Sequence, residues 1–490
     1  MKYVLSLLAV CCFVSGVDAA RPNILIVIAD DMTWRDCQPY GNDEVDTPHL
    51  AKLASQGMKF NACFTSTAMC APTRAQLYTG MFPIRNGAYP NHSAVREGTK
   101  SIPHHFKSLG YRVGLIGKTH FKPARSFPFE RLAGKGGASD TKKISEFVNR
   151  DKEQPYCLVV ASNQPHSPWT VGPQGKYKPD ELSIPPFLED TPATRETLAK
   201  YYAEIEYLDG QVGDCMKIVD ESGQADDTIF VFTSEQGSAL PFAKWTCYDL
   251  GLKTGLIVRW PGHIKAGSEN SAMVQYVDLV PTLIEAADAD PTKIDTGRPE
   301  GPDGGSGFDG KSFLSVLLGR KDAHRKFVFG AHTTRGIING SMSYPVRSVR
   351  SDSLKLIQNL SHESAFSNVN TGNGGGGGVW QSWIEAEGKT VDRARFYTHR
   401  PAEELYDLAK DPYELHNVIT DPAYADQAEV LRQQLAAWMK QQKDRGVKTE
   451  ALAGQRKKTP GAPQKKPNTG RKKNKASKTG AGHTEVRRDE

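Results

Sequence analysis

Residues 23–31 read Asn-Ile-Leu-Ile-Val-Ile-Ala-Asp-Asp, an unbroken apolar run that ends in two adjacent carboxylates. A short run of β-branched and other apolar residues, with no polar residue at alternate positions, is typical of a strand buried on both faces of a parallel sheet. Ligands of such sheets bind beyond the carboxyl ends of the strands. Asp30 and Asp31 are therefore candidate functional residues.

Similar apolar runs recur along the chain, with longer mixed segments between them. They span residues 112–117, 157–161, 229–233 and 256–258. One of the mixed segments, 194–219, carries apolar residues at helical spacing with charges between them. Strands that alternate with helices predict an α/β fold, in which helices sandwich a mostly parallel central sheet.

Polar side chains follow four of these runs directly or within a few residues. They are Asp30 and Asp31, Lys118 and His120, His166, and Glu235 and Gln236. Carboxylates, an amine and imidazoles at one edge of the predicted sheet favour a single site for an anionic substrate. The alternative is that they are ordinary solvated strand ends.

The sequence divides into four predicted parts. Residues 1–20 combine Lys2 with an apolar stretch and two alanines before Arg21, which is typical of a secretory signal peptide and predicts a periplasmic or extracellular protein. The apolar stretch is shorter than the roughly 20 residues that a spanning helix needs, so we expect no transmembrane segment. Residues 21–330 form the main α/β domain, 331–443 a smaller C-terminal α+β domain, and 444–490 a disordered basic tail.

The positive charge of the chain is concentrated in that tail. The 490 residues carry a formal net charge of +6, from 62 Lys and Arg against 56 Asp and Glu. Fourteen of these basic residues and four of these acidic ones fall in residues 445–490, which leaves residues 1–444 with a net charge of −4. A nucleic-acid-binding protein is therefore not expected. The tail leaves open a non-catalytic protein that attaches to anionic glycans.

The sharpest local motif is at residues 70–80, Cys-Ala-Pro-Thr-Arg-Ala-Gln-Leu-Tyr-Thr-Gly. A cysteine with proline two positions and arginine four positions later resembles the signature of the sulfatase family. Further segments resemble motifs of this family, namely 22–25, 47–50, 117–120, 232–234 and 404–408. A closer likeness, to the heparan N-sulfatase subgroup, rests on residues 114–118, 342–349 and 359–360.

The resemblance implies an alkaline-phosphatase-like fold and a sulfatase catalytic domain over residues 21–330. It also implies that a formylglycine-generating enzyme oxidises Cys70 to Cα-formylglycine, whose hydrated aldehyde is the nucleophile. A divalent cation would be held by Asp30, Asp31, residue 70, Glu235 and Gln236. Oxygen ligands suit Ca²⁺ better than zinc or copper, and Mg²⁺ is the second choice.

One part of this ligand set departs from the common family pattern. In that pattern, Asp followed by Asn or His occupies the places of Glu235 and Gln236. Both side chains here keep oxygen donors but are one methylene longer. Either the local backbone is set back to accommodate them, or metal binding is altered.

The resemblance also implies roles for the remaining side chains. Arg74 would hold the formylglycine hydroxyl, and Lys118 and Lys244 would bind sulfate oxygens, with Lys253 as the alternative to Lys244. His166 would protonate the leaving oxygen or nitrogen, and His120 would help a formylglycine hydroxyl to lose its proton. Two further residues, Arg347 and Trp169, either contact a sugar or are structural.

The sequence thus predicts an exported sulfatase that hydrolyses sulfate esters or sulfamates of sulfated sugars. The alternatives are a formylglycine-dependent phosphodiester or phosphonate hydrolase of the same superfamily, and the non-catalytic glycan-binding protein.

Overall fold

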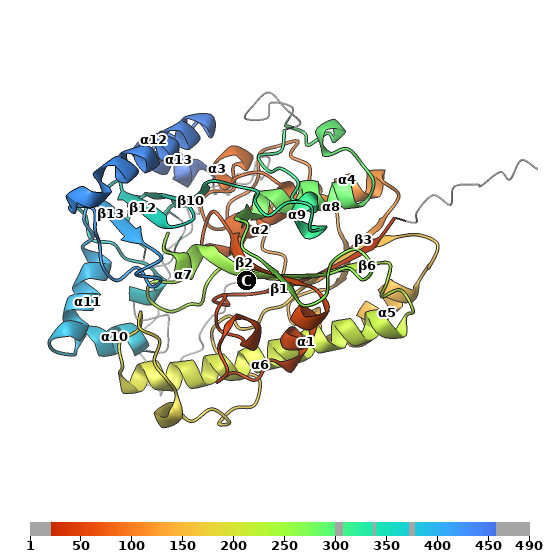
Figure 1. Ribbon diagram of the computed structural model, residues 1–490, viewed down its shortest axis with the longest axis horizontal. Coiled ribbons are helices and arrows are strands. Elements are labelled where there is room, and N and C mark those ends of the chain that lie inside the picture. The colour runs from red at the N-terminus through yellow and green to blue at the C-terminus, as the bar shows by residue number, and fades with distance from the viewer. Residues whose placement is uncertain (1–20, 299–306, 336, 338–339, 372–377, 457–490) are drawn as a thin grey trace, which may run out of the picture. The chain divides into compact units, whose positions relative to one another are not determined.

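The largest element of the structure is a nine-stranded sheet (Figure 1). The computed structural model describes residues 21–298, 307–335, 337, 340–371 and 378–456. The strands of the sheet lie in the order β4 (Glu130–Ala133), β3 (Arg112–Gly117), β5 (Tyr156–Ala161), β1 (Asn23–Ala29), β6 (Thr228–Ser234), β7 (Lys253–Arg259), β2 (Met58–Phe64) and β8 (Ser268–Asn270), with β9 (Val274–Gln275) beside β2. From β4 to β6 all pairs are parallel. The predicted mostly parallel sheet is confirmed.

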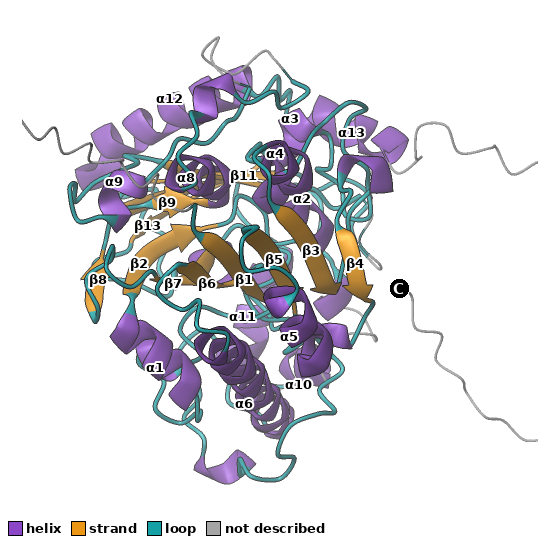
Figure 2. Ribbon diagram, turned by 90° about the vertical axis from the view of Figure 1, so that its right-hand side faces the viewer, coloured by secondary structure: helices purple, strands orange, loops and turns teal. Residues whose placement is uncertain are grey.

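Both faces of this sheet are covered by helices (Figure 2). Along β1, Leu25 and Val27 point into one buried core, whereas Ile24 and Ile26 point into the other, as the period of two in a strand requires. The first core includes side chains of α1 (Pro48–Gln56), α5 (Thr141–Asn149) and α6 (Pro192–Glu221). The second includes side chains of α2 (Cys70–Thr79), α4 (Ile102–Ser108) and α8 (Leu279–Ala286). An apolar run without alternation was therefore the correct signal for a central strand.

A smaller antiparallel sheet follows in the C-terminal part of the chain. Its strands lie in the order β10 (Val328–His332), β11 (Val346–Arg350), β12 (Leu354–Asn359) and β13 (Glu403–Asp407). Trp438 of α12 (Ala425–Gln441) stacks on Phe329 of β10 with ring centroids 5.1 Å apart, so α12 packs on this sheet. The other helices are α3 (Pro83–Asn86), α7 (Asp249–Leu252), α9 (Leu314–Leu317), α10 (Val379–Ile384), α11 (Lys389–Thr398) and α13 (Val447–Arg456). The predicted boundary at residues 330 and 331 lies within β10, and the division into domains stays a prediction.

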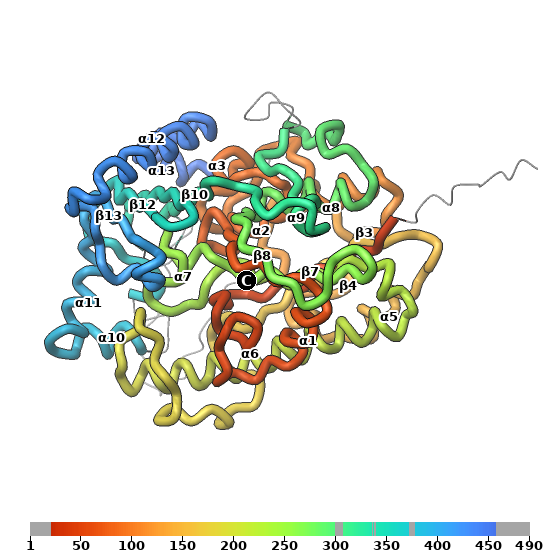
Figure 3. Tube along the Cα trace, viewed as in Figure 1, coloured from red at the N-terminus to blue at the C-terminus, as the bar shows by residue number. Residues whose placement is uncertain are grey.

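The prediction that residues 444–490 form a disordered tail is wrong for its first part, because residues 447–456 form α13. Figure 3 shows α13 in blue beside α3 in orange, near the opposite end of the colour scale. Arg456 Nε donates to the carbonyl of Gly87 at 3.0 Å, and the Tyr89 hydroxyl donates to the carbonyl of Thr449 at 3.2 Å. Tail composition alone could not reveal these contacts with distant residues. The rest of the predicted tail, 457–490, and the predicted signal peptide, 1–20, lie outside the described residues.

Within the described part of the chain, no helix combines the length and the apolar character that crossing a membrane would require.

Candidate active site

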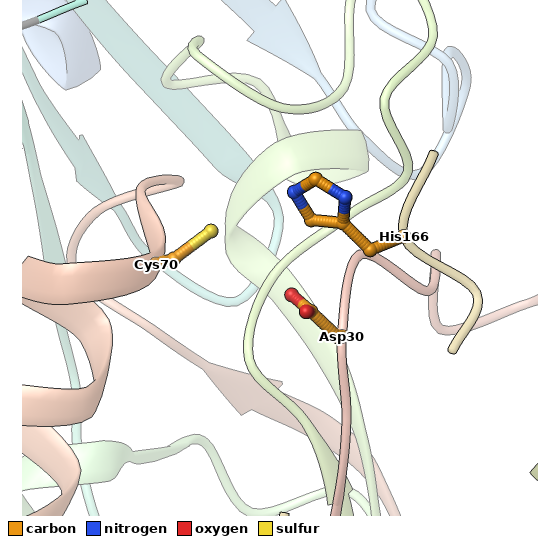
Figure 4. Close-up of side chains that lie close together, drawn as sticks. All are labelled: Asp30, Cys70 and His166. Carbon is orange, nitrogen blue, oxygen red and sulfur yellow. The ribbon is translucent and has the colours of Figure 1, made fainter. Parts of the chain in front are cut away.

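The candidate site lies at the carboxyl ends of β1 and β6, opposite the first turn of α2. Figure 4 shows the side chains of Asp30, Cys70 and His166 directed toward one another. The strands β1 and β6 are parallel neighbours with Ala29 paired to Ser234, so the residues that follow them emerge side by side. Asp30, Asp31, Glu235 and Gln236 are brought together in this way.

An unusual backbone conformation lets two consecutive aspartates serve the same site. Successive side chains of a strand point to opposite faces, so Asp30 and Asp31 would diverge if β1 continued. Asp31 instead has a φ of 65°, in the left-handed region that non-glycine residues seldom adopt. The chain turns there, and Met32 N donates to the Ser234 hydroxyl oxygen at 3.2 Å. Both carboxylates are fully buried and face the same cluster.

Each carboxylate of the cluster pairs with a cation. Lys118 Nζ lies 2.5 Å from Asp30 Oδ2, and Lys244 Nζ lies 2.6 Å from Asp31 Oδ2. The third pair joins Arg74 Nε to Glu235 Oε2 at 2.5 Å. Five of the six side chains are at most 3% exposed, and Lys118 is 13% exposed. When all three carboxyl groups are ionised, three negative and three positive charges balance one another in a largely buried site, where Coulomb interactions are strong.

The three carboxyl groups differ in pKa. Burial alone would raise the pKa of Asp31, but Lys244 and His166 hold it below its usual value. Burial also acts on Glu235, whose pKa Arg74 and Lys118 nevertheless keep well below its usual range. For Asp30, burial and the neighbouring Glu235 raise the pKa well above its usual value. A bound divalent cation would favour the ionised form of all three.

The donor set fits a hard divalent cation. Carboxylate oxygens of Asp30, Asp31 and Glu235 lie within 4.8 Å of one another and of Cys70 Sγ. Among the described residues, Asp30 Oδ1 and Gln236 Oε1 are buried and have no hydrogen-bond partner. Gln236 Nε2 donates to Asp31 Oδ1 at 2.6 Å, and rotation of the amide would offer Oε1 to a cation instead. Oxygen donors of this kind match Ca²⁺ or Mg²⁺.

Glu235 uses its additional length to reach two cations at once. While Oε2 binds Arg74, Oε1 lies 3.5 Å from Lys118 Nζ. The backbone N–H of Glu235 donates to the carbonyl of Ala29 at 3.0 Å, so the residue directly continues the ladder between β6 and β1. The longer carboxylate is thus accommodated by its contact with Arg74.

Cys70 occupies the first turn of α2, and its surroundings do not favour the thiolate form. Its Sγ lies 3.4 Å from Gln236 Nε2 and 3.9 Å from Asp31 Oδ1, and the side chain is buried. Burial, and then the negative charge of Glu235, raise the pKa of the thiol. A thiol is a poor nucleophile, whereas the amide dipoles at the start of a helix favour negative charge nearby. The net effect of these surroundings on Cys70 is to favour the neutral thiol.

Two histidines of the predicted site have different surroundings. His166 Nε2 lies 3.5 Å from Asp31 Oδ2, and its side chain is 38% exposed, so it sits where a substrate could enter. His120 Nε2 lies 2.8 Å from Nδ1 of His92. Burial, together with the charges of Lys118 and His92, lowers the pKa of His120 to about 2, which keeps its ring neutral. Sequence reasoning missed His92, because no motif or spacing connects it with His120.

The structure also separates residues that the sequence left as alternatives. Lys244 pairs with Asp31, whereas Lys253 Nζ lies over the ring of Trp34 at 3.9 Å.

Arg347 is fully buried, with its guanidinium bound to Asp444 and to the carbonyl of His332. Trp169 is buried too and donates from Nε1 to the carbonyl of Pro165 at 2.8 Å. Arg347 and Trp169 therefore have structural contacts.

Comparison with known proteins identifies the family. The family model described as "Sulfatase" matches residues 22–141 and 137–289, which is more than half of the chain. The chain belongs to the sulfatase family. A second model, "N-sulphoglucosamine sulphohydrolase, C-terminal", matches residues 237–368 of this sulfatase. The predicted resemblance to sulfatases, with its likeness to the heparan N-sulfatase subgroup, is confirmed.

Two relatives match this sulfatase over most of its length. An ulvan-active sulfatase of Formosa agariphila is 32% identical over 445 residues, which cover 88% of this chain and 82% of the relative. The human N-sulphoglucosamine sulphohydrolase is 29% identical over 490 residues, covering 87% and 92% of the two chains. This sulfatase is therefore a sulfuric ester hydrolase.

Solved structures share the fold. A protein in complex with its substrate D-glucosamine-2-N,6-O-disulfate superposes with a TM-score of 0.65 at 21% identity, over 87% of this chain and 99% of its own. A phosphonate monoester hydrolase of Silicibacter pomeroyi has a TM-score of 0.64 at 20% identity, over 87% and 96% of the two chains. The predicted alkaline-phosphatase-like fold is confirmed, and the same fold is used for sulfur and phosphorus substrates.

Proposed function

We propose that this sulfatase hydrolyses sulfate esters or sulfamates of sulfated sugars, with a formylglycine made from Cys70 and a bound divalent cation. One observation carries the proposal. Residue 70 projects into a buried cluster in which three carboxylates and three cations surround a single point at the carboxyl edge of the sheet. A charged cluster of this kind is costly to bury and is typical of a site that acts on a charged substrate.

The residues that would hold the cation are Asp30, Asp31, Glu235, Gln236 and residue 70. We favour Ca²⁺ over Mg²⁺, because the donors are carboxylate and amide oxygens on side chains of unequal length, and Ca²⁺ tolerates irregular coordination. When present, the formylglycine would supply a hydrated aldehyde as nucleophile. The divalent cation would supply positive charge that offsets the charge of the sulfate oxygens.

Charge balance explains how the site would accept an anion. With all three carboxyl groups ionised and no metal ion bound, the charges of the six side chains of the cluster sum to zero. A divalent cation would make the sum +2, and an anionic sulfate group would then reduce it. Lys118 and Lys244 would turn from their carboxylates toward sulfate oxygens, while Arg74 would stay with Glu235 and hold the hydroxyl of residue 70.

His166 is the group that would protonate the leaving atom. It is the more exposed of the two histidines, and its Nδ1 lies 2.5 Å from the carbonyl oxygen of Ser167. If Nδ1 donates to that carbonyl, Nε2 is left to face Asp31 and an incoming substrate. Asp31 Oδ2 lies 3.5 Å from that nitrogen. His120, which is half-buried with a buried Nδ1 and a neutral ring, would accept a proton from residue 70.

For the sugar, we favour N-sulfoglucosamine of heparin-like chains, with O-sulfated polysaccharide as the second choice. The support is the match of residues 237–368 to the C-terminal model of N-sulphoglucosamine sulphohydrolase and the similarity to the human enzyme of that name. We further propose export through the predicted signal peptide and maturation by a formylglycine-generating enzyme.

A mass measurement and a substrate panel test the proposal together. Conversion of Cys70 to formylglycine removes about 18 Da from the peptide that contains it. The matured protein should hydrolyse a sulfamate or a sulfate ester faster than a phosphodiester or a phosphonate monoester. Faster turnover of a phosphorus substrate would favour the phosphonate hydrolase alternative. Glycan binding without any turnover, lost on truncation after Arg456 so that Asp444 and α13 are kept, would favour the glycan-binding alternative.

Substitution of one of two nearby lysines tests the assignment of the sulfate-binding residues. We expect Lys244→Met to lower kcat/KM for a sulfated sugar by roughly 100-fold or more, since a charge that contacts the reacting group is lost. Lys253→Met should have a much smaller effect, because Lys253 lies over Trp34. Steady-state kinetics of both variants measure this, and a larger loss in Lys253→Met would reverse the assignment.

A further inference from the structure

The imidazole of His92 lies against the imidazole of His120 beside the candidate site. His92 Nδ1 is 2.8 Å from His120 Nε2, and the ring centroids are 4.7 Å apart with an angle of 47° between the planes. A hydrogen bond between two ring nitrogens needs one protonated and one bare nitrogen. This contact therefore couples the proton positions of the two rings.

The backbone is strained at both ends of this contact. His92 has a φ of 60° and His120 a φ of 48°, so both adopt the left-handed region. For residues other than glycine this conformation costs energy, and it persists where surrounding contacts impose it, often at functional sites. One such contact joins the two loops, since Val95 N donates to the carbonyl of Lys122 at 2.9 Å. The fold thus holds the two imidazoles together despite the strain.

The second ring nitrogen of His120 is left for another partner. Nδ1 is buried and, among the described residues, has no hydrogen-bond partner. Buried polar atoms of native proteins are nearly always hydrogen-bonded, so such an atom calls for an explanation. His120 follows Lys118, whose carbonyl accepts from Arg74 at 3.2 Å, and Arg74 lies one helical turn from residue 70. A group at residue 70 or a bound substrate is the partner that this position favours.

We propose that His92 is a positioning residue, which accepts a hydrogen bond from Nε2–H of His120 and so keeps Nδ1 of His120 bare. A neutral imidazole carries one proton, and with that proton on Nε2 the Nδ1 lone pair is available. When a hydroxyl at residue 70 loses its proton, the O–H bond breaks, the electron pair stays on oxygen, and the proton bonds to Nδ1. This inference rests on the proposed function, because only that function requires the proton transfer.

The tautomer of His120 can be measured without turnover. We would label the full-length protein, with Cys70 unmodified, with ¹⁵N-histidine and assign His120 through His120→Gln. The expected spectrum shows a neutral His120 protonated at Nε2. His92→Gly should shift this ring toward a mixture of tautomers, and glycine adopts a φ of 60° without strain, so the loop should keep its fold. Protonation at Nδ1 in the wild type, or an unchanged tautomer in His92→Gly, would overturn the proposal.

Kinetics of the matured enzyme supply the second readout. His92→Gly should lower kcat by about 10- to 100-fold, the usual effect of losing a residue that orients another, and leave KM within about threefold. Added imidazole should restore part of the loss. His92→Asn, whose side-chain oxygen can accept in place of Nδ1 and which tolerates the left-handed region, should keep most of the activity.

His263→Gly is the matched control. The imidazole of His263 also lies against an aromatic ring, since its centroid is 3.9 Å from that of the Trp260 ring. However, His263 follows β7, which runs antiparallel to β6, so it lies at the opposite ends of the strands from the candidate site. We expect no loss of kcat in this variant. An equal loss in His263→Gly, or a His92→Gly effect confined to KM, would contradict a positioning role. If the wild type hydrolyses no sulfated sugar, the proposed function fails, and the tautomer measurement still decides the inference about His92.

Discussion

Cys70→Ala is expected to lower kcat/KM for a sulfamate or a sulfate ester by about 10⁴-fold or more, the scale of losing a covalent nucleophile. The variant leaves the charged cluster of the site in place but prevents formation of the aldehyde. Steady-state kinetics on purified, matured protein measure the effect.

Cys63→Ala is the matched control for this variant. Cys63 is also buried, with its side chain in the core formed by the sheet and helices such as α2, and it belongs to none of the candidate metal-binding groups. Relative to the unmodified protein, both variants lose one buried sulfur, so their thermal stabilities should fall by similar amounts. Activity within about tenfold of wild type in Cys70→Ala would refute covalent catalysis by residue 70.

Asp31→Asn is expected to have the second largest effect, on both cation binding and turnover. Asp31 has four side-chain partners in the site, since it contacts Lys244, Gln236, His166 and Cys70. Removing its charge should weaken Ca²⁺ binding by about 100-fold or more and lower kcat/KM by about 10³-fold. Isothermal titration with Ca²⁺ and steady-state kinetics check the two expectations separately.

Loss of stability has to be separated from loss of function in this variant. Breaking a buried ion pair leaves Lys244 without its counter-charge and is strongly destabilising. The double variant Asp31→Asn/Lys244→Met removes both charges, so it should recover thermal stability without recovering activity. Asp309→Asn removes another buried aspartate, which lies 3.3 Å from Arg85, and should leave Ca²⁺ affinity unchanged. Normal Ca²⁺ affinity in Asp31→Asn would exclude Asp31 as a ligand.

The central sheet was predictable because its strands are buried on both faces. In β1 and β3 the predicted residues match the strands of the structure, and the predicted helix 194–219 lies within α6. Burial on both faces leaves a continuous apolar run that one sequence shows by itself. The strand β2 was missed, because polar residues such as Lys59 and Asn61 interrupt it and it lies near the edge of the sheet.

The chemical identity of the site was also predictable, since each motif lies directly after a strand or at the start of a helix. Asp30, Lys118 and Glu235 were selected because they directly follow predicted strands, and Cys70 was selected by its resemblance to the sulfatase signature. The structure places these four residues together. What the motifs could not specify was which cation faces which carboxylate. The choice between Lys244 and Lys253 depends on the path of the loop after β6, which no local pattern encodes.

The sequence by itself determined the family, the α/β class and most residues of the candidate site, because these depend on local patterns and short motifs. Only the tertiary structure decided the pairing of Arg74 with Glu235, the buried contacts of Arg347, the contact of His92 with His120 and the ordered helix α13. These features join residues between 28 and more than 360 positions apart. Such contacts depend on how the whole chain packs, and their energies come from burial and charge in three dimensions, which a single sequence does not display.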